Sequence, residues 1–331
     1  MKALVLKGVG QLLSLENVPD PTPESGEAVV AIRCAALNHR DVWIQKGLYA
    51  GLKFPIILGS DGAGVVIETG SGVDPAWRGK EVIINPSIAW GESERWQGKD
   101  FRILGLPDNG TFAERVKVPA TQLVSKPAHL DFAHAAALPL AGLTAYRALF
   151  SRAGLVSGER VLVTGIGGGV ALFALQFALA VGATVYVTSG SDEKLARAKQ
   201  LGAAGGANYR RESWFKDLKQ VGFDVIIDSA GGKGFSKLTE LAAPGARIAF
   251  FGATFGNPPE LDMRRTFWKQ LSLLGSTMGS PSDFAAMMRL VERHKIQPLA
   301  EILYPLSEGN EALATMDNAK QFGKIILTVA Q

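Results

Sequence analysis

A glycine-rich turn between a short apolar run and an uncharged helical segment constrains the fold of this 331-residue chain most strongly. The run 160–164 (Arg-Val-Leu-Val-Thr) leads directly into 165–171 (Gly-Ile-Gly-Gly-Gly-Val-Ala), and an apolar segment follows over 172–181. A β-rich run occupies 184–188, just after Gly182. Strand, turn, buried helix and strand in this order predict a βαβ unit with two parallel strands.

The uncharged stretch 165–188 is also long enough to cross a bilayer, so a membrane span is an alternative interpretation. Glycines open this stretch and Gly182 divides it, and a turn, a helix and a strand therefore explain it better. We expect no membrane segment.

The glycines of the turn predict a binding site for the pyrophosphate of a dinucleotide. Glycine lets the backbone approach the phosphates closely, and the N-terminus of the following helix offers unpaired N–H groups. The spacing departs from the strict G-x-G-x-x-G pattern, because Val170 and Ala171 stand where the last glycine is sought. We assign cofactor binding to Gly167, Gly168, Gly169 and Val170; a purely structural turn is the alternative.

The end of the second strand predicts NADP(H) as the cofactor. Folds that bind NAD usually place Asp or Glu there, which hydrogen-bonds the ribose 2′-hydroxyl and would repel a 2′-phosphate. This chain has Ser189, Ser191 and Lys194 instead, whose hydroxyl and ammonium groups suit a phosphate. Asp192 and Glu193 lie in the first turn of the next helix, where acidic residues suit the helix dipole. For Lys194, a solvated cation on that helix is the alternative.

Further α/β units extend the parallel sheet. The runs 223–228 and 247–252 predict two more strands. Ligands in such sheets bind beyond the carboxyl ends of the strands. We therefore place Ser229, Phe251 and Gly252 near the nicotinamide half of the cofactor.

The flanking segments predict a different fold. Short β-runs separated by turn clusters fill the chain to about residue 123 and are typical of a β-barrel. A last β-run at 323–329 cannot easily join the parallel sheet, so we expect it to return to the first domain. The predicted fold class is α/β: a Rossmann-type doubly wound parallel sheet, residues 124–294, inserted into a β-barrel catalytic domain formed by 1–123 and 295–331.

The run 271–275 predicts the last strand of the parallel sheet. An open edge leaves backbone N–H and C=O groups unpaired, which invites pairing with a second copy of the chain. We therefore expect a homodimer; an edge covered by the chain's own loop at 278–281 is the alternative.

Composition narrows the classes of function. The net charge is +4 and the pI about 9.1, yet Lys and Arg form no basic stripe, so we expect no nucleic-acid partner. Cys34 is the single cysteine, so no intramolecular disulfide forms. The first β-run begins at Met1, and we expect no signal peptide and a cytoplasmic location.

Several segments resemble the medium-chain dehydrogenase/reductase superfamily in their order and spacing. Besides the glycine turn, they are 36–41 (ALNHRD), 59–64 (GSDGAG), 141–146 (AGLTAY) and 323–327 (GKIIL). The resemblance covers essentially the whole chain and is greatest to the zinc-free quinone oxidoreductase branch, with some likeness to zinc-type alcohol dehydrogenases. It implies a GroES-like fold for the catalytic domain.

The resemblance also bears on metal binding. Family members with zinc use a Cys, a His-Glu pair and a second Cys or His for the catalytic metal. The matching positions here are Asn38, Ser60 with Asp61, and Leu140. A zinc site needs three protein ligands, and Ser and Leu are poor ones, so we expect no metal. His39 neighbours Asn38, but a lone histidine does not make a site.

Individual side chains take their expected roles from the resemblance. Tyr49 is similar to a tyrosine of related enoyl reductases and is the candidate oxyanion donor; a packed loop aromatic is the alternative. Asn38 is similar to an asparagine that faces cofactor and substrate, with a turn-forming role as the alternative. Thr144 is similar to a residue near the nicotinamide, or it only packs its helix. Tyr209 is similar to a tyrosine near the adenosine phosphate.

Apolar side chains favour a hydrophobic substrate. Ile44, Trp90 and Leu140 are candidates to line its cleft. Trp90 lies in the segment 86–110, which matches the family's structural zinc lobe but contains no cysteine, and packing of that lobe is the alternative role for it.

The expected absence of a metal narrows the reactions that this protein can catalyse. Reduction of a conjugated carbonyl or a quinone needs hydride at carbon and a hydrogen-bond donor at the developing oxyanion, whereas oxidation of a simple alcohol needs stronger activation. We therefore predict an NADPH-dependent reductase of a quinone or an α,β-unsaturated carbonyl. The alternatives are a zinc-free alcohol or aldehyde dehydrogenase and an NADPH-binding protein without catalytic activity.

Overall fold

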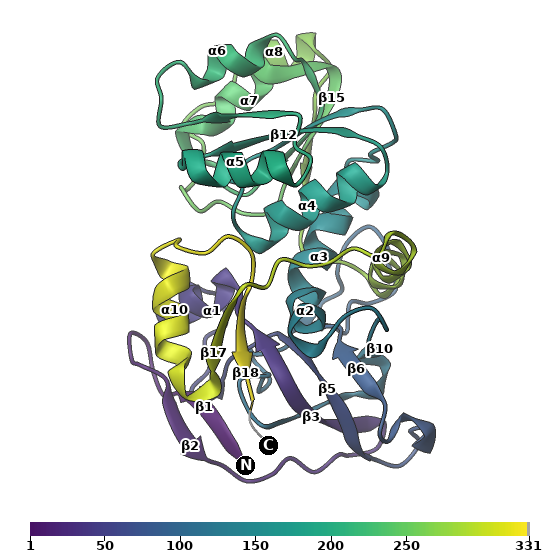
Figure 1. The fold of residues 1–331 in the computed structure, drawn as a ribbon. Helices are drawn as coiled ribbons and strands as arrows, with labels where there is room; N and C mark the ends of the chain where they lie inside the picture. The colour runs from purple at the N-terminus through teal and green to yellow at the C-terminus, as the bar shows by residue number, and fades with distance from the viewer. Residues whose placement is uncertain (330–331) are drawn as a thin grey trace. The chain divides into compact units, whose positions relative to one another are not determined.

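The computed structural model describes residues 1–329, which divide into two compact units. The first unit comprises Met1–Ala141 and the chain from Ser280 onward, and the second comprises Gly142–Gly279. The chain thus leaves the first unit once and returns to it, as the sequence predicts for an inserted domain (Figure 1).

The second unit is built on a parallel sheet. Its strands are β11 (Arg160–Val163), β12 (Thr184–Ser189), β13 (Gly205–Asn208), β14 (Phe223–Asp228), β15 (Ala242–Phe250) and β16 (Ser272–Gly275). Their order is β13-β12-β11-β14-β15-β16, and every neighbouring pair runs parallel. Counted from β11, this is the order 3-2-1-4-5-6 of a doubly wound dinucleotide-binding fold. The predicted Rossmann-type sheet is confirmed.

Helices connect these strands. They are α4 (Gly169–Ala180), α5 (Asp192–Gln200), α6 (Trp214–Lys219), α7 (Phe235–Leu241) and α8 (Met263–Trp268), preceded by α3 (Pro139–Tyr146) and a π-helical turn, η3 (Arg147–Arg152). Helix α4 carries no charge and buries Leu172, Phe173 and Phe177, so its apolar residues belong to the interior of the unit. Within residues 1–329, no helix is both long and apolar enough to span a membrane.

The first unit contains mostly antiparallel sheets. One has the order β2-β1-β4 and a larger one β10-β6-β5-β3-β18-β17, with β9 also paired to β3. The strands are β1 (Lys2–Leu6), β2 (Ser14–Asn17), β3 (Glu27–Ala36), β4 (Ile56–Ile57), β5 (Asp61–Thr69), β6 (Glu81–Ile84), β7 (Ser87–Ile88), β8 (Arg102–Ile103), β9 (Arg115–Pro119), β10 (Leu123–Ser125), β17 (Ile302–Pro305) and β18 (Ile325–Thr328). Strand β18 runs antiparallel to β3, with Ile326 opposite Ala36, so the predicted return of the C-terminal strand is confirmed.

Helices α1 (His39–Gln45), α2 (Phe132–Ala137), α9 (Pro281–His294) and α10 (Gly309–Asp317) complete the first unit. The boundaries between the units differ from the predicted ones, because the segments 124–141 and 280–294 belong to the first unit. Helix α2 packs on β3, β5 and β18. At the start of α9, the hydroxyl groups of Ser280 and Ser282 donate to the Glu94 carboxylate at 2.5 and 2.8 Å.

Candidate functional site

The glycine turn of the second unit joins β11 to α4. Gly168 is the N-cap of this helix, so the N–H groups of the first turn, from Gly169 onward, have no partner within the helix. Gly165 and Gly167 have φ angles of +66° and +133°, which glycine adopts far more readily than other residues. A Cβ atom placed on Gly168 meets no described atom within 4 Å, so open space lies beside this glycine.

The end of β12 brings the predicted phosphate-binding side chains together. Ser191 is the N-cap of α5, and its hydroxyl oxygen accepts from the Lys194 N–H at 3.3 Å. The Ser189 hydroxyl oxygen accepts from the Ser191 N–H at 3.2 Å. The Lys194 ammonium nitrogen lies 3.2 Å from where a Cβ atom on Gly167 would be, so this cation extends from α5 to the glycine turn. Burial lowers the pKa of Lys194.

Two more polar groups approach the same strand end. A Cβ atom on Gly190 would lie 2.9 Å from the Tyr209 hydroxyl oxygen and 3.0 Å from Nε of Arg210. Tyr209 is 41% exposed, so solvent reaches part of this residue. Tyr209 and Arg210 thus adjoin the glycine that separates Ser189 from Ser191.

The carboxyl ends of β14 and β15 also meet. The Ser229 carbonyl oxygen lies 2.9 Å from where a Cβ atom on Gly252 would be, and the Phe251 N–H donates to the Asp228 carbonyl oxygen at 3.1 Å. The Asp228 carboxylate is buried and accepts from the Thr164 hydroxyl at 2.6 Å. Burial raises the pKa of Asp228. The structure therefore brings together Ser229, Phe251 and Gly252.

A buried polar network is the main feature of the first unit. The Lys324 ammonium group donates to Oδ1 of Asn38 at 2.6 Å and to Oδ2 of Asp61 at 2.9 Å. Nδ2 of Asn38 donates to the same Asp61 oxygen at 2.9 Å. The exposed fractions are 0% for Asp61, 4% for Lys324 and 7% for Asn38. One cation, one anion and one amide therefore contact one another with little access to water.

Backbone groups complete this network. Oδ1 of Asp61 accepts from the Leu140 N–H at 2.7 Å. The Asn38 N–H donates to Oδ2 of Asp41 at 2.8 Å, so Asp41 caps the start of α1. Burial raises the pKa of Asp41 to about 6. These contacts fix Asn38 at the point where β3 ends and α1 begins.

A second buried cation lies close to Tyr49. Nη1 of Arg40 donates to the Ser60 hydroxyl oxygen at 2.7 Å and to the Leu104 carbonyl oxygen at 2.9 Å. Its guanidinium carbon lies 5.1 Å from the centroid of the Tyr49 ring, within the range of a cation–π contact. Tyr49 is partly buried and packs against the core of the unit.

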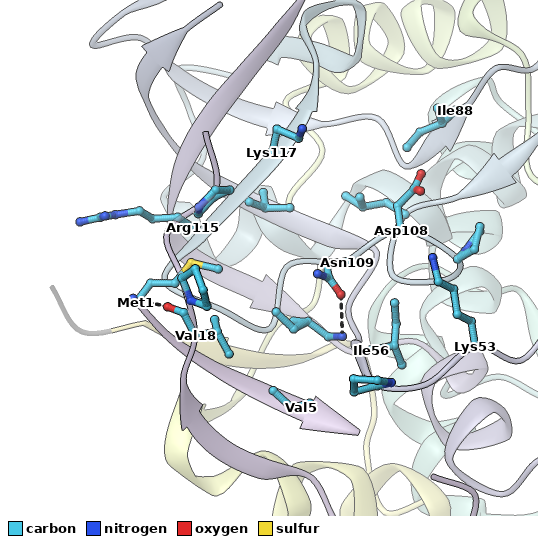
Figure 2. A pocket seen from close by; sticks show the side chains of 18 of the residues that line it. Met1, Val5, Val18, Lys53, Ile56, Ile88, Asp108, Asn109, Arg115 and Lys117 are labelled. Atoms are coloured by element: carbon cyan, nitrogen blue, oxygen red, sulfur yellow. Dashed lines mark hydrogen bonds between the residues drawn. The ribbon is translucent and has the colours of Figure 1, made fainter. Parts of the chain in front are cut away.

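A groove of about 660 Å³ also lies in the first unit, but it is lined by different residues. Figure 2 shows Lys117, Arg115 and Asp108 around it, with the Asn109 side chain accepting from the Ile57 N–H. Its charges are largely paired within the protein, as in the ion pair of Lys117 with Glu27 at 2.8 Å. None of the predicted site residues lines this groove.

Comparisons with known proteins agree with this architecture. The model of the alcohol dehydrogenase GroES-like domain matches residues 24–128, and that of the zinc-binding dehydrogenases matches residues 169–293. A zinc-type alcohol dehydrogenase-like protein, YogA, of Leptosphaeria maculans is 35% identical over 96% of this chain and 94% of its own. The chain belongs to the medium-chain dehydrogenase/reductase superfamily. It is therefore an oxidoreductase, and its fold combines a GroES-like domain with a Rossmann-type domain.

Other members of the superfamily are similar over their full length. The acryloyl-coenzyme A reductase of Metallosphaera sedula is 31% identical over 99% of this chain and 100% of its own. A crystal structure of an NAD-dependent alcohol dehydrogenase superimposes with a TM-score of 0.94 and 38% identity, covering 100% of both chains. Similar members of the superfamily thus include both a reductase and an alcohol dehydrogenase.

The superfamily includes zinc enzymes, but the residues at the matching positions of this chain do not fit a zinc ion. Both Asp61 oxygens already accept hydrogen bonds, and the Lys324 ammonium group lies on one of them. Two unit charges 4 Å apart repel by about 4 kcal/mol at an effective dielectric constant of 20, and a divalent ion beside the ammonium would feel about twice that. Among residues 1–329, no group of three or more His, Cys, Asp or Glu side chains is arranged to bind a metal ion.

Sequence reasoning did not assign a role to Lys324. The signal was present, because Lys324 lies in the segment 323–327 that carries the family resemblance. Its polar partners, Asn38 and Asp61, are 286 and 263 residues away in the sequence. Only the pairing of β18 with β3 brings the lysine to them.

Of the three apolar candidates, two are buried and one, Leu140, contacts the polar network. Ile44 has 0% exposure and packs in the core of the first unit, so we do not carry it forward as a substrate contact. Trp90 is 2% exposed, and its ring lies 5.3 Å from that of Phe101 in an edge-to-face contact, as expected for a packed lobe. Leu140 is partly buried and reaches the network through its backbone. Thr144, on α3, is 6% exposed.

Proposed function

We propose that this oxidoreductase is an NADPH-dependent reductase of a quinone or an α,β-unsaturated carbonyl and that it works without a metal ion. This would place it in the zinc-free quinone oxidoreductase branch of the superfamily. The observation that carries the proposal is the contact of the Lys324 ammonium with Asp61 and Asn38 at the positions of the family's metal ligands. Without a metal to activate an alcohol, reduction of a conjugated acceptor is the chemistry that the remaining donors serve best.

The second unit would bind the cofactor. Gly167, Gly168, Gly169 and Val170 would hold the pyrophosphate, because the helix N-terminus there offers unpaired N–H groups. Ser229, Phe251, Gly252 and Thr144 would contact the nicotinamide half. When bound, the reduced nicotinamide supplies the hydride that reduces the acceptor carbon.

The preference for NADPH rests on the strand end after β12. Ser189, Ser191 and Tyr209 adjoin Gly190, and none of these three residues is acidic. The Asp192 carboxylate also lies near this strand end, where it accepts from Asn208, the residue paired with Ser189, at 3.0 Å. Asp192, on α5, accepts from Arg211 Nη2 at 2.8 Å. These hydroxyl groups, with Lys194, favour a 2′-phosphate over a ribose hydroxyl.

The first unit would bind and activate the substrate. The Asn38 side chain has a second N–H group besides the one that Asp61 accepts, and this group would donate to the substrate oxygen as charge develops there. Tyr49 would be the second donor. The buried Arg40 guanidinium near the Tyr49 ring would favour the negative charge that develops on the substrate oxygen. Leu140 would border the apolar part of the substrate, whereas Trp90, at 2% exposure, packs within its own lobe.

The relatives support two candidate reactions. The name of the Metallosphaera sedula protein, acryloyl-coenzyme A reductase, supports a conjugated thioester as substrate, because a thioester also presents a carbonyl next to a C=C bond. The NAD-dependent alcohol dehydrogenase of similar structure favours alcohol oxidation as the second candidate.

A substrate panel tests the proposal. NADPH oxidation is followed with a quinone, an enone, an enoyl thioester and a saturated aldehyde, and NADP⁺ reduction is followed with simple alcohols. We expect turnover of one of the conjugated acceptors or the quinone and little oxidation of alcohols. Efficient alcohol oxidation would favour the second candidate, and tight NADPH binding without turnover would favour a protein with no catalytic activity.

We further propose a homodimer that pairs through β16, the edge strand of the parallel sheet. Helix α8, just before this strand, exposes 65% of Phe267 and 83% of Trp268, which supports a protein contact in this region.

The single cysteine, Cys34, is a free thiol and supports a reducing compartment, for which we propose the cytoplasm.

A further inference from the structure

The strand order of the second unit reverses between β11 and β14. Strands β12 and β13 follow on one side of β11, whereas β15 and β16 lie beyond β14. In doubly wound sheets a dinucleotide binds in the crevice at this reversal, outside the carboxyl ends of the strands. The residues at the carboxyl ends of β11 and β14 therefore lie on the two sides of the proposed cofactor site.

One buried hydrogen bond joins these two strand ends. Strands β11 and β14 pair in parallel with Val163 opposite Ile227, and the residues that come next are Thr164 and Asp228. The Thr164 hydroxyl donates to Oδ1 of Asp228 at 2.6 Å. Thr164 is 8% exposed and Asp228 is 2% exposed, so water competes little for this bond.

The other carboxylate oxygen of Asp228 fixes the loop that follows β14, residues 229–232, here called the nicotinamide loop. Oδ2 accepts from the Gly231 N–H at 2.9 Å. Burial raises the pKa of Asp228, and hydrogen bonds from Thr164, Gly231 and Ala230 oppose this shift because they stabilise the carboxylate. Asp228 therefore bonds the residue before the glycine turn with one oxygen and the nicotinamide loop with the other.

The nicotinamide loop is in turn bonded to the segment after β15. The Phe255 N–H donates to the Ala230 carbonyl oxygen at 2.8 Å, and the Gly232 N–H donates to the Gly256 carbonyl oxygen at 2.8 Å. A Cβ atom on Gly231 would lie 2.6 Å from the same Gly256 oxygen, so the two backbones are in close contact. A contact that places the nicotinamide loop thus also places the segment after β15.

We propose that Asp228 is a positioning residue that holds the glycine turn and the nicotinamide loop at a fixed separation, so that both halves of one dinucleotide bind together. Asp228 acts through Thr164 and the loop backbone and does not contact the cofactor itself. A site that is already held in its binding geometry loses less freedom when the ligand binds. The inference rests on the proposed cofactor site and adds to it the contact that sets its span.

A purely structural role is the competing explanation, because the same hydrogen bond joins two central strands of the sheet. The amino ends of these strands offer the comparison. The Asp224 carboxylate accepts from the Arg160 backbone N–H at 2.9 Å and from its guanidinium group at 3.1 Å, so it also joins β14 to β11. Asp224→Asn weakens the same strand pair away from the crevice and is therefore the matched control.

The experiment compares the binding of NADPH with that of adenosine 2′,5′-bisphosphate, which lacks the nicotinamide half. Thr164→Val keeps the shape of the side chain and removes its hydroxyl. We expect this variant to raise the Kd of NADPH roughly three- to tenfold, as for the loss of one hydrogen bond, and to leave the Kd of the bisphosphate unchanged. A displaced nicotinamide should also lower kcat about ten- to a hundredfold. Thr164→Ser, which retains the hydroxyl, should restore both values.

Asp224→Asn should lower the Tm without changing either Kd. If Thr164→Val does not fold, Thr164→Ala is measured in its place, because the smaller side chain leaves room for a water molecule beside the carboxylate. Equal weakening of both ligands, or no change in either, would overturn the inference and leave the proposed cofactor intact. A wild type that bound neither ligand would instead overturn the proposed cofactor and the inference together.

Discussion

Replacing Gly168 with alanine separates a cofactor-binding turn from a merely structural one. Gly168 has φ −82° and ψ 159°, an extended conformation that alanine adopts without strain. An added Cβ atom meets no described atom within 4 Å. The expected cost in folding stability is therefore limited to the N-cap position, about 1 kcal/mol or less.

NADPH binding should respond much more strongly than stability. A pyrophosphate that approaches the backbone at Gly168 would meet the new methyl group and lose at least one charge-assisted hydrogen bond. That loss is about 1.5–3 kcal/mol, or roughly ten- to a hundredfold in Kd. Fluorescence titration with NADPH measures the Kd, and thermal unfolding without cofactor measures the stability.

Gly234→Ala is the matched control, because Gly234 is also a helix N-cap with a negative φ and no described atom within 4 Å of an added Cβ. It should leave the Kd unchanged. If Gly168→Ala bound NADPH as the wild type does, the turn would be structural only and the assignment of the pyrophosphate site would be wrong.

Lys194→Ala should weaken NADPH binding about ten- to a hundredfold and NADH binding little. As a control, replacing the exposed Lys199 with alanine should change the binding of neither cofactor. Equal weakening of both cofactors would mean that Lys194, which lies against the glycine turn, contacts the pyrophosphate instead of the 2′-phosphate. Cys34 is 8% exposed, and burial raises its pKa to about 11, so only about 0.1% of this thiol is ionised at pH 8. A disulfide reagent should therefore modify Cys34 only after the protein unfolds. Rapid modification of the native protein would contradict the burial of this side chain. Leu273→Pro in β16 should convert a dimer into monomers or aggregates in light scattering, and a wild type that stays monomeric at high concentration would refute the edge-strand interface.

Short sequence patterns predicted those parts of the fold that depend on residues close together in the sequence. The strand at 223–228 and the glycine turn before α4 follow from apolar runs and glycine positions, and both appear at the expected places. The predicted helix at 172–181 begins earlier, at Gly169, because glycine has a low helix propensity and conceals a helix start.

Features that depend on distant contacts were less accessible from the sequence. An apolar residue such as Ile44 has the same pattern whether it faces a substrate cleft or the core, and only its lack of exposed surface places it in the core. The Lys324–Asp61 pair joins residues 263 positions apart, so no local pattern reveals it. The missing metal ligands were visible in the sequence, but the cation beside Asp61 was not.

We propose that hydride transfer from NADPH proceeds in this protein without a metal ion. The most direct test measures the rate of NADPH oxidation with the best acceptor of the panel, on protein of known metal content, before and after prolonged treatment with a chelator. We predict zinc far below one ion per chain and the same rate after chelation. One zinc per chain, with activity that chelation abolishes and zinc restores, would refute a metal-free mechanism.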